Sequence, residues 1–221
     1  KEELLIQTEQ EEAKYEELLG RIDTQKRSIL GDINSLRKKK SELLAAIKRA
    51  QQKPKTNLSS TGWYFSQIDP RWAYSTIGWS GSYMADYGCA VTSVAMVFKY
   101  YGINIDPGTL AKQPIFWEDL IVWPKTWQFL SLISSTAHAG IDWSRIDQEI
   151  AAKHPVIVFV RANGRGAGHY VVIHSKDKTG NYIVHDPIWG PNIYLNTTQA
   201  YIGALYGTST SVDQMIIYHP Y

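Results

Sequence analysis

The sequence predicts an α+β domain, in which a helical half packs on an antiparallel sheet, preceded by a long coiled-coil α-helix. The first observation is that Tyr15 is the only aromatic residue in the first 58, while the other 26 follow. The second is that no proline occurs before Pro54, in a stretch rich in Glu, Lys, Leu and Ile. The third is a set of short β-branched runs late in the chain, which are typical of strands. We therefore divide the chain into a coiled-coil helix (1–52), a linker (53–62) and a domain (63–221).

The N-terminal helix is predicted from an apolar stripe whose steps are mostly of three and four residues. The stripe consists of Leu4, Tyr15, Leu18, Ile22, Ile29, Ile33, Leu36, Leu43, Ile47 and Ala50. A stripe of this kind needs a partner surface, which we expect to be a second copy, another helix, or the following domain. Acidic residues dominate the start of the helix and basic residues its remainder, so an antiparallel pair of copies would oppose unlike charges.

Residues 53–62 are polar and rich in turn-forming types, as is typical of a linker. The roughly 160 residues that follow are enough to bury one substantial core. The whole chain has a net charge of only +2, and its aromatic residues are not interleaved with the basic run 37–40. Because nucleic-acid sites combine both features, we expect this run to be a solvated face and predict no nucleic-acid partner.

The only cysteine, Cys89, follows Gly88 and opens an apolar run that predicts a helix reaching Tyr101, with Gly102 just beyond it. A thiol in the first turn of a helix faces backbone N–H groups and the positive end of the helix dipole. This favours the thiolate, which is the nucleophilic form. The alternative interpretation is a small buried apolar side chain, and the partners of Cys89 decide between the two.

Two strands are predicted at residues 168–174 and 182–187, on either side of a polar turn. Folding them about that turn gives three predicted pairs: His169–Asp186, Val171–Val184 and Ile173–Tyr182. His169 and Asp186 then share one face, with Cβ atoms roughly 5 Å apart, while His174 and His185 point to the other. A carboxylate at that distance orients an imidazole, which makes His169 the candidate base and Asp186 its orienting group. The alternative is a structural cross-strand hydrogen bond.

A fourth candidate, Gln67, lies upstream of the cysteine. Its side-chain N–H and the backbone N–H of Cys89 can together bind the oxyanion of a tetrahedral intermediate. One glutamine is weak evidence, so the argument depends on the chain order Gln67, Cys89, His169, Asp186. A histidine that is oriented by a carboxylate and presented to a thiol is the arrangement that covalent catalysis requires.

That order is the one found in papain-like cysteine peptidases, and four short sequence segments indicate which family of these peptidases the chain resembles. The segments are Gln67-Ile68-Asp69-Pro70-Arg71-Trp72, Gly88-Cys89-Ala90-Val91-Thr92-Ser93-Val94-Ala95-Met96, Gly168-His169-Tyr170-Val171-Val172-Ile173 and Asp186-Pro187. Over residues 60–221 the chain resembles the bacteriocin-processing (double-glycine leader) cysteine peptidases and their stand-alone bacterial relatives. The resemblance implies a papain-like fold, with Gln67 in the oxyanion hole, Cys89 as nucleophile, His169 as base and Asp186 as orienter. His154, also in this range, is interpreted as a structural residue without a partner.

Gly88 and Gly168 stand next to the candidate nucleophile and base, and we expect them to let a substrate approach. The glycine-rich run 164–168 is not a phosphate loop, because it lacks the lysine–hydroxyl ending and precedes a strand. No zinc-type ligand spacing is present, so we predict neither a metal nor a cofactor. The tryptophans at 117, 123 and 127 are expected in the core.

Three functions remain open at this point. The first is a cysteine peptidase acting on a peptide or protein, with the coiled coil serving assembly, docking or autoinhibition. The second gives the same residues a peptidoglycan stem peptide as substrate, and the third is a catalytically silent peptide-binding module. The relatives that the resemblance implies are usually exported, and the sequence has no transmembrane run. We therefore expect an extracellular or cell-envelope location in a bacterium.

Overall fold

The computed structural model describes residues 53–124 and 132–220 of the chain. The chain divides into two units between Ala45 and Ala46, and all the described residues belong to the second unit. The predicted coiled-coil helix over residues 1–52 lies outside the described residues, as does Trp127. Residues 53–60 have no regular secondary structure, but they are attached to the domain. The side-chain amide of Asn192 exchanges two hydrogen bonds, of 2.9 and 3.0 Å, with the backbone of Ser59.

The described residues contain one 3-10 helix and five α-helices. They are η1 (Thr61–Trp63), α2 (Met84–Tyr87), α3 (Cys89–Tyr100), α4 (Pro107–Leu110), α5 (Trp143–Ala151) and α6 (Leu195–Tyr206). Helix α3 ends within one residue of the predicted position, with Tyr101 as its C-cap and Gly102 left-handed at φ = +84°. Helix α5 begins after Asp142, whose side chain accepts a hydrogen bond from the backbone N–H of Arg145. Within the described ranges, no helix has the length and apolar character needed to cross a bilayer.

The strands of the described residues form two antiparallel sheets. Strands β1 (Phe116–Trp117) and β2 (Leu120–Ile121) make a short ribbon. The larger sheet has the order β3-β8-β4-β5-β6-β7. Its strands are β3 (Leu132–Gly140), β4 (Val156–Ala162), β5 (Ala167–Lys176), β6 (Tyr182–Asp186), β7 (Gly190–Tyr194) and β8 (Thr210–Pro220). The predicted α+β class is thus confirmed for this part of the chain.

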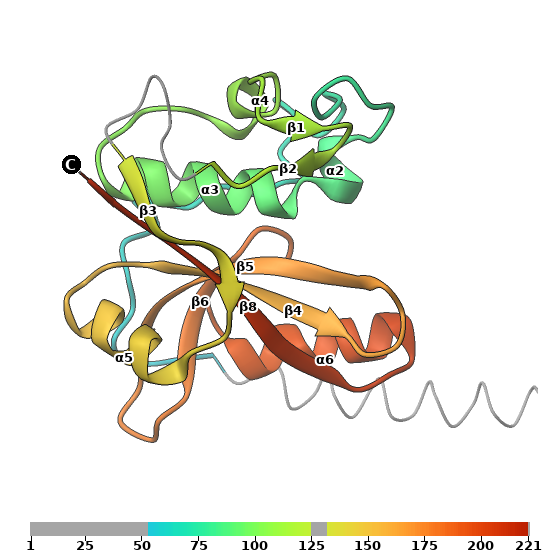
Figure 1. Cartoon of the computed structure of the whole chain (residues 1–221). Coiled ribbons are helices and arrows are strands. Elements are labelled where there is room, and N and C mark those ends of the chain that lie inside the picture. Colours follow the sequence, from blue (N-terminus) through green and yellow to red (C-terminus); the bar gives the residue numbers. More distant parts are fainter. Residues whose placement is uncertain (1–52, 125–131, 221) are drawn as a thin grey trace, which may run out of the picture. The chain divides into compact units, whose positions relative to one another are not determined.

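Helices cover the six-stranded sheet on both faces (Figure 1). One core joins α3 to Ile157, Val172 and Ile216 of the sheet, and it also contains Trp123. The other core joins α5 and α6 to the sheet side chains of opposite parity, such as Val158 and Val171. Strands buried on both faces explain the nearly continuous apolar runs in the sequence. The core prediction is therefore right for Trp123, whereas that for Trp117 is wrong, because its side chain is 68% exposed.

The predicted register of the hairpin formed by β5 and β6 is wrong by two residues. Ile173 pairs with Val184 rather than with Tyr182, and the ladder has an irregularity just after Ile173. Next to the turn, where Lys176 pairs with Tyr182, the error is three residues, because the turn is centred on Thr179, and the irregularity reduces it to two. Because a shift of two residues leaves every side chain on its own face, His169 and Asp186 still share a face. They are diagonal rather than directly opposed neighbours, a separation that longer side chains can bridge.

Candidate active site

Cys89 is the first residue of α3, and its side chain is partly exposed. Helix α3 packs against β5, and the backbone N–H groups of Tyr170 and Ala90 donate hydrogen bonds to the sulfur. The backbone N–H of Cys89 itself has no acceptor inside the helix, because it belongs to the first turn. The thiol therefore lies among backbone donors that favour a negative charge.

His169 lies near the start of β5, and Asp186 is the last residue of β6. The imidazole Nε2 donates a hydrogen bond of 2.9 Å to Oδ1 of Asp186. Both side chains are buried, with exposed fractions of 3% and 0%. The imidazole is also hydrogen-bonded to the side chain of Cys89, which leaves Nδ1 as the nitrogen on that side. The structure thus brings three predicted site residues into one chain of contacts from thiol to carboxylate.

These three groups change one another's pKa. Burial favours the neutral imidazole, but the charge and hydrogen bond of Asp186, together with Cys89, raise the pKa of His169 to about 10. Burial also opposes ionisation of Cys89, yet the hydrogen bond and positive charge of His169 hold the pKa of the thiol below its usual value. Burial also opposes ionisation of Asp186, but the charge of His169, together with the hydrogen bonds from His169, Thr198 and the backbone of Trp189, lowers the pKa of that carboxyl. All three shifts favour the charged forms, namely a thiolate, an imidazolium and a carboxylate.

The carboxylate of Asp186 has a full set of donors. Besides His169, its Oδ1 accepts from the backbone N–H groups of Ile188 (2.9 Å) and Trp189 (3.1 Å). Its Oδ2 accepts from the hydroxyl of Thr198, a buried residue of α6, at 2.7 Å. The sequence reasoning did not single out Thr198, because a threonine inside a helix carries no signal of its own. Four donors fix the orientation of Asp186, and through it that of the imidazole.

The indole ring of Trp189 covers the histidine. Its centroid lies 5.2 Å from that of His169 in an edge-to-face contact, and it stacks on Tyr201 of α6 at 4.8 Å. This packing helps to keep water from the bond between His169 and Asp186, which strengthens that bond electrostatically. Trp189 was also missed in the sequence, where its only signal is an aromatic residue shortly after Asp186.

Gln67 is fully buried and lies against the turn that precedes α3. Its side-chain Nε2 donates to the carbonyl of Ala85 at 2.8 Å, and its backbone N–H donates to the carbonyl of Pro187 at 2.9 Å. The segment that contains Gln67 is therefore attached both to α2, just before Cys89 in the chain, and to Pro187, the residue after Asp186. An amide nitrogen carries two N–H bonds, so Nε2 has a second one beyond that given to Ala85. The Oε1 atom has no hydrogen-bond partner among the described residues.

Gly88 and Gly168 have packing reasons of their own. A Cβ atom at Gly88 would overlap the carbonyl oxygen and the side chain of Met84. A Cβ atom at Gly168 would overlap the ring of Phe159 and the carbonyl oxygen of Val160, both on β4. These contacts account for two glycines in the folded domain. Their role in substrate binding stays a prediction.

A protein-family model described as the Peptidase_C39 like family matches residues 63–206. The match spans well over half of the chain and includes Gln67, Cys89, His169 and Asp186. It ends with α6, so β8 lies beyond it. No curated protein matches the chain.

Proposed function

The chain belongs to the Peptidase_C39 like family, and we propose that it is a papain-like cysteine peptidase that hydrolyses peptide bonds through Cys89, His169 and Asp186. The observation that carries this proposal is the position of His169. Its ring is hydrogen-bonded to the thiol on one side and to a buried, fully hydrogen-bonded carboxylate on the other. A nucleophile, a base and an orienting group in that sequence of contacts are what acyl transfer to a thiol requires.

In the acylation step, the thiolate of Cys89 attacks the carbonyl carbon of the scissile bond, and the C=O electron pair moves onto the oxygen. When the intermediate collapses, the C–N bond breaks and the imidazolium gives its Nδ1 proton to the leaving amine. The products are a free amine and an acyl-thioester on Cys89. Asp186 accepts from Nε2 throughout, so the ring keeps its orientation while its charge changes.

In the deacylation step, water gives a proton to Nδ1 of His169 while its oxygen attacks the thioester carbonyl. Collapse of this second intermediate breaks the C–S bond and releases a carboxylic acid. The thiolate and the imidazolium are then restored. The same nitrogen therefore acts as acid in the first step and as base in the second.

The proposed oxyanion donors are the backbone N–H of Cys89 and the second N–H on Nε2 of Gln67. The bond to Ala85 holds the Gln67 amide in place before a substrate arrives, which is the condition for preorganised stabilisation. One donor of this kind is worth roughly 3–4 kcal/mol in the transition state.

The first test is the rate at which iodoacetamide alkylates the protein as pH varies, followed by intact mass. Because the sequence contains a single cysteine, every label reports on Cys89. We expect fast labelling well below pH 7 in the wild type, and labelling only near the ordinary thiol pKa of about 8.5 in His169→Ala. Equal profiles in the two proteins, with both folded by circular dichroism, would contradict an activated thiolate.

The second test is hydrolysis of two substrate sets: peptides with glycine or other small residues before the scissile bond, and muropeptides carrying stem peptides. Hydrolysis should disappear in both Cys89→Ala and His169→Ala. Cleavage of muropeptides alone would assign the protein to the cell wall. Unchanged turnover in Cys89→Ala would overturn the mechanism. Slow labelling together with no turnover would favour a peptide-binding module.

A further inference from the structure

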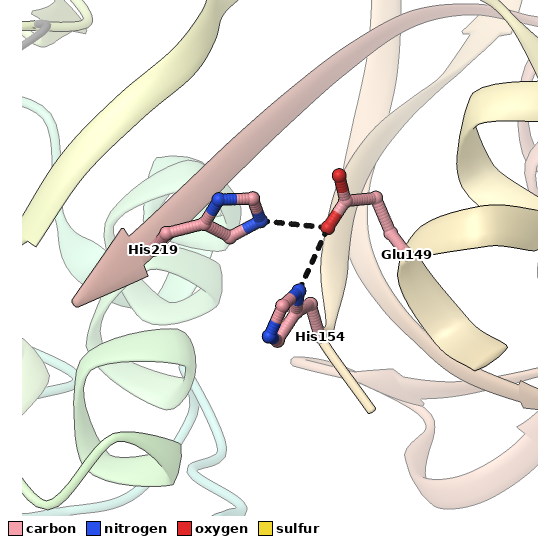
Figure 2. A group of neighbouring side chains, drawn as sticks. All are labelled: Glu149, His154 and His219. Carbon is pink, nitrogen blue, oxygen red and sulfur yellow. Dashed lines mark hydrogen bonds and ion pairs between the residues drawn. The ribbon is translucent and has the colours of Figure 1, made fainter. Parts of the chain in front are cut away.

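A second cluster of ionisable side chains lies outside the candidate active site, where three segments of the chain meet (Figure 2). Glu149 belongs to α5, His154 to the loop between α5 and β4, and His219 to the end of β8. Both imidazoles point at the same oxygen of the Glu149 carboxylate, His219 from the left and His154 from below in this view (Figure 2). The sequence analysis expected His154 to have no partner, and that expectation is wrong.

The two histidines converge on a single atom. Oε2 of Glu149 accepts from Nδ1 of His154 at 3.0 Å and from Nε2 of His219 at 2.6 Å. These three atoms all lie within 4.8 Å of one another, and the imidazole centroids are 4.4 Å apart. Two imidazoles at this separation would repel each other if both were protonated. If each ring instead carries its proton on the other nitrogen, lone pairs of all three ligand atoms converge, and a shared cation can bind between them.

The surroundings of Glu149 prepare it to act through one oxygen. Its side chain is 5% exposed, and its Oε1 is paired with Arg145 at 2.7 Å, which keeps the carboxylate ionised. Oε2 is left for the two histidines. The hydroxyl of Tyr101, whose ring faces His154 at a centroid distance of 6.3 Å, is buried without a hydrogen-bond partner among the described residues. A bound ion with a coordinated water would supply such a partner.

We propose that Glu149, His154 and His219 form a binding site for a divalent transition-metal ion, with Zn²⁺ the best match. Two imidazole nitrogens and one carboxylate oxygen are a known zinc ligand set, in which a fourth, open position is taken by water. Ca²⁺ and Mg²⁺ are excluded by the two nitrogen ligands, because both ions require oxygen. The site was not predicted from the sequence, because His219 is far along the chain from Glu149 and His154, and closely spaced ligands are the usual sequence signal of a zinc site.

Binding requires only small movements. Ligand atoms around a tetrahedral zinc ion lie roughly 3.3 Å apart, since the metal–ligand distances are about 2.0–2.1 Å. The present separations of 3.0 and 2.6 Å are those of hydrogen bonds. The ion takes the place of the two shared protons, and each neutral ring carries its proton on the other nitrogen. Both histidine side chains are partly exposed, at 35% and 26%, so they have room to move away from Oε2 by the required amounts, about 0.3 Å for His154 and about 0.7 Å for His219.

The site would join β8 to α5 and to the loop before β4. Strand β8 lies between β3 and β4 in the sheet, so an ion held by His219 would fix the end of this strand. Anything that binds only the folded state stabilises it in proportion to the logarithm of ligand concentration. The inference concerns residues that the proposed peptidase mechanism does not use, and it stands or falls independently of that mechanism.

The experiment is a calorimetric titration of the full chain with Zn²⁺, after chelator treatment and in a Cys89→Ala background. The background matters because a thiolate beside His169 is itself a zinc ligand pair. We expect one ion per chain at micromolar or lower concentration and a rise in melting temperature that a chelator reverses. His219→Gln and Glu149→Gln should each weaken binding at least tenfold. Asp147→Asn, which changes an exposed acid on the same helix, should leave it unchanged.

Co²⁺ provides a second readout that requires no substitution of a proposed ligand. In the Cys89→Ala background, bound Co²⁺ should show the intense visible bands of a four-coordinate site. Absence of saturable binding in this background would overturn the proposal, and so would equal affinity in the His219→Gln chain. A cluster whose stability responds to pH but not to Zn²⁺ would show that the three residues form an ion-pair network instead.

Discussion

Replacing Asp186 with asparagine separates the charge of this residue from its geometry. An asparagine oxygen in the place of Oδ1 can still accept from Nε2 of His169 and from the backbone N–H groups of Ile188 and Trp189. The amide NH₂ would then face Thr198, whose hydroxyl can reverse its role and accept. Asp186→Asn therefore keeps the hydrogen-bond pattern and removes the negative charge. Asp186→Ala would instead leave several buried donors without an acceptor.

The structure sets a lower bound on how far Asp186→Asn should lower the pKa of His169. The pKa of His169 is raised from 6.5 to about 10, which corresponds to roughly 5 kcal/mol in favour of the imidazolium at 1.36 kcal/mol per unit. The charge of Asp186 is the largest of the four contributions that raise it against burial. It must supply at least a quarter of the total, or about 1 kcal/mol. Loss of the charge should therefore lower the pKa of His169 by about one unit or more.

The assay is again alkylation of Cys89 as a function of pH. The wild type should show two steps, one below the ordinary thiol range as the ion pair forms and one near pH 10 as His169 loses its proton. In Asp186→Asn the first step should move up and the second should move down by about one unit. Asp147→Asn is the matched control, because it removes the same charge from a half-exposed carboxylate that pairs with Lys176. An upper step that stays near pH 10 in Asp186→Asn would refute the reasoning.

Three further outcomes are expected elsewhere in the domain. Burial, with mutual repulsion at His174, lowers the pKa of His174 to about 3 and of His185 to about 4. NMR titration should find both rings neutral at pH 5. The two histidines should also reduce the free energy of unfolding as pH falls below 6.5, because the unfolded chain then takes up protons that the folded chain does not. Ring resonances that titrate near pH 6.5 would contradict this. Gly168→Ala should lower the free energy of unfolding by about 1–3 kcal/mol in urea, because its Cβ meets the β4 backbone. Gly140→Ala, with open space around it, is the control and should change little. Thr198→Val should cost about 1.5–3 kcal/mol of unfolding free energy through loss of a bond to a buried carboxylate, and Thr198→Ser should restore most of it.

The sequence prediction was most accurate where it depended on local patterns. The helix after Cys89 could be predicted because its start, its apolar run and its ending glycine all lie within a few residues of one another. The shared face of His169 and Asp186 could also be predicted, since it depends only on the parity of the register. The pairing itself was wrong by two residues, because the turn is centred on Thr179, further along the chain than the prediction assumed, and the irregularity after Ile173 offsets only one residue of that error. The prediction that His169 and Asp186 share a face was therefore unaffected by the two-residue error. The prediction that they are directly opposed was not.

Groups joined across elements could not be predicted, and the reason is physical. Thr198 is recognisable as a partner of Asp186 only when α6 is packed beneath the end of β6. Glu149, His154 and His219 become one cluster only when β8 is inserted beside β4. In both cases the sequence contains ordinary residues at unremarkable spacings, and the chemistry is created by burial. A carboxylate that is removed from water must find donors, so each buried acid in this fold identifies its partners once the topology is known. Applied to Asp186, that requirement leads to the candidate active site; applied to Glu149, it leads to the proposed metal site.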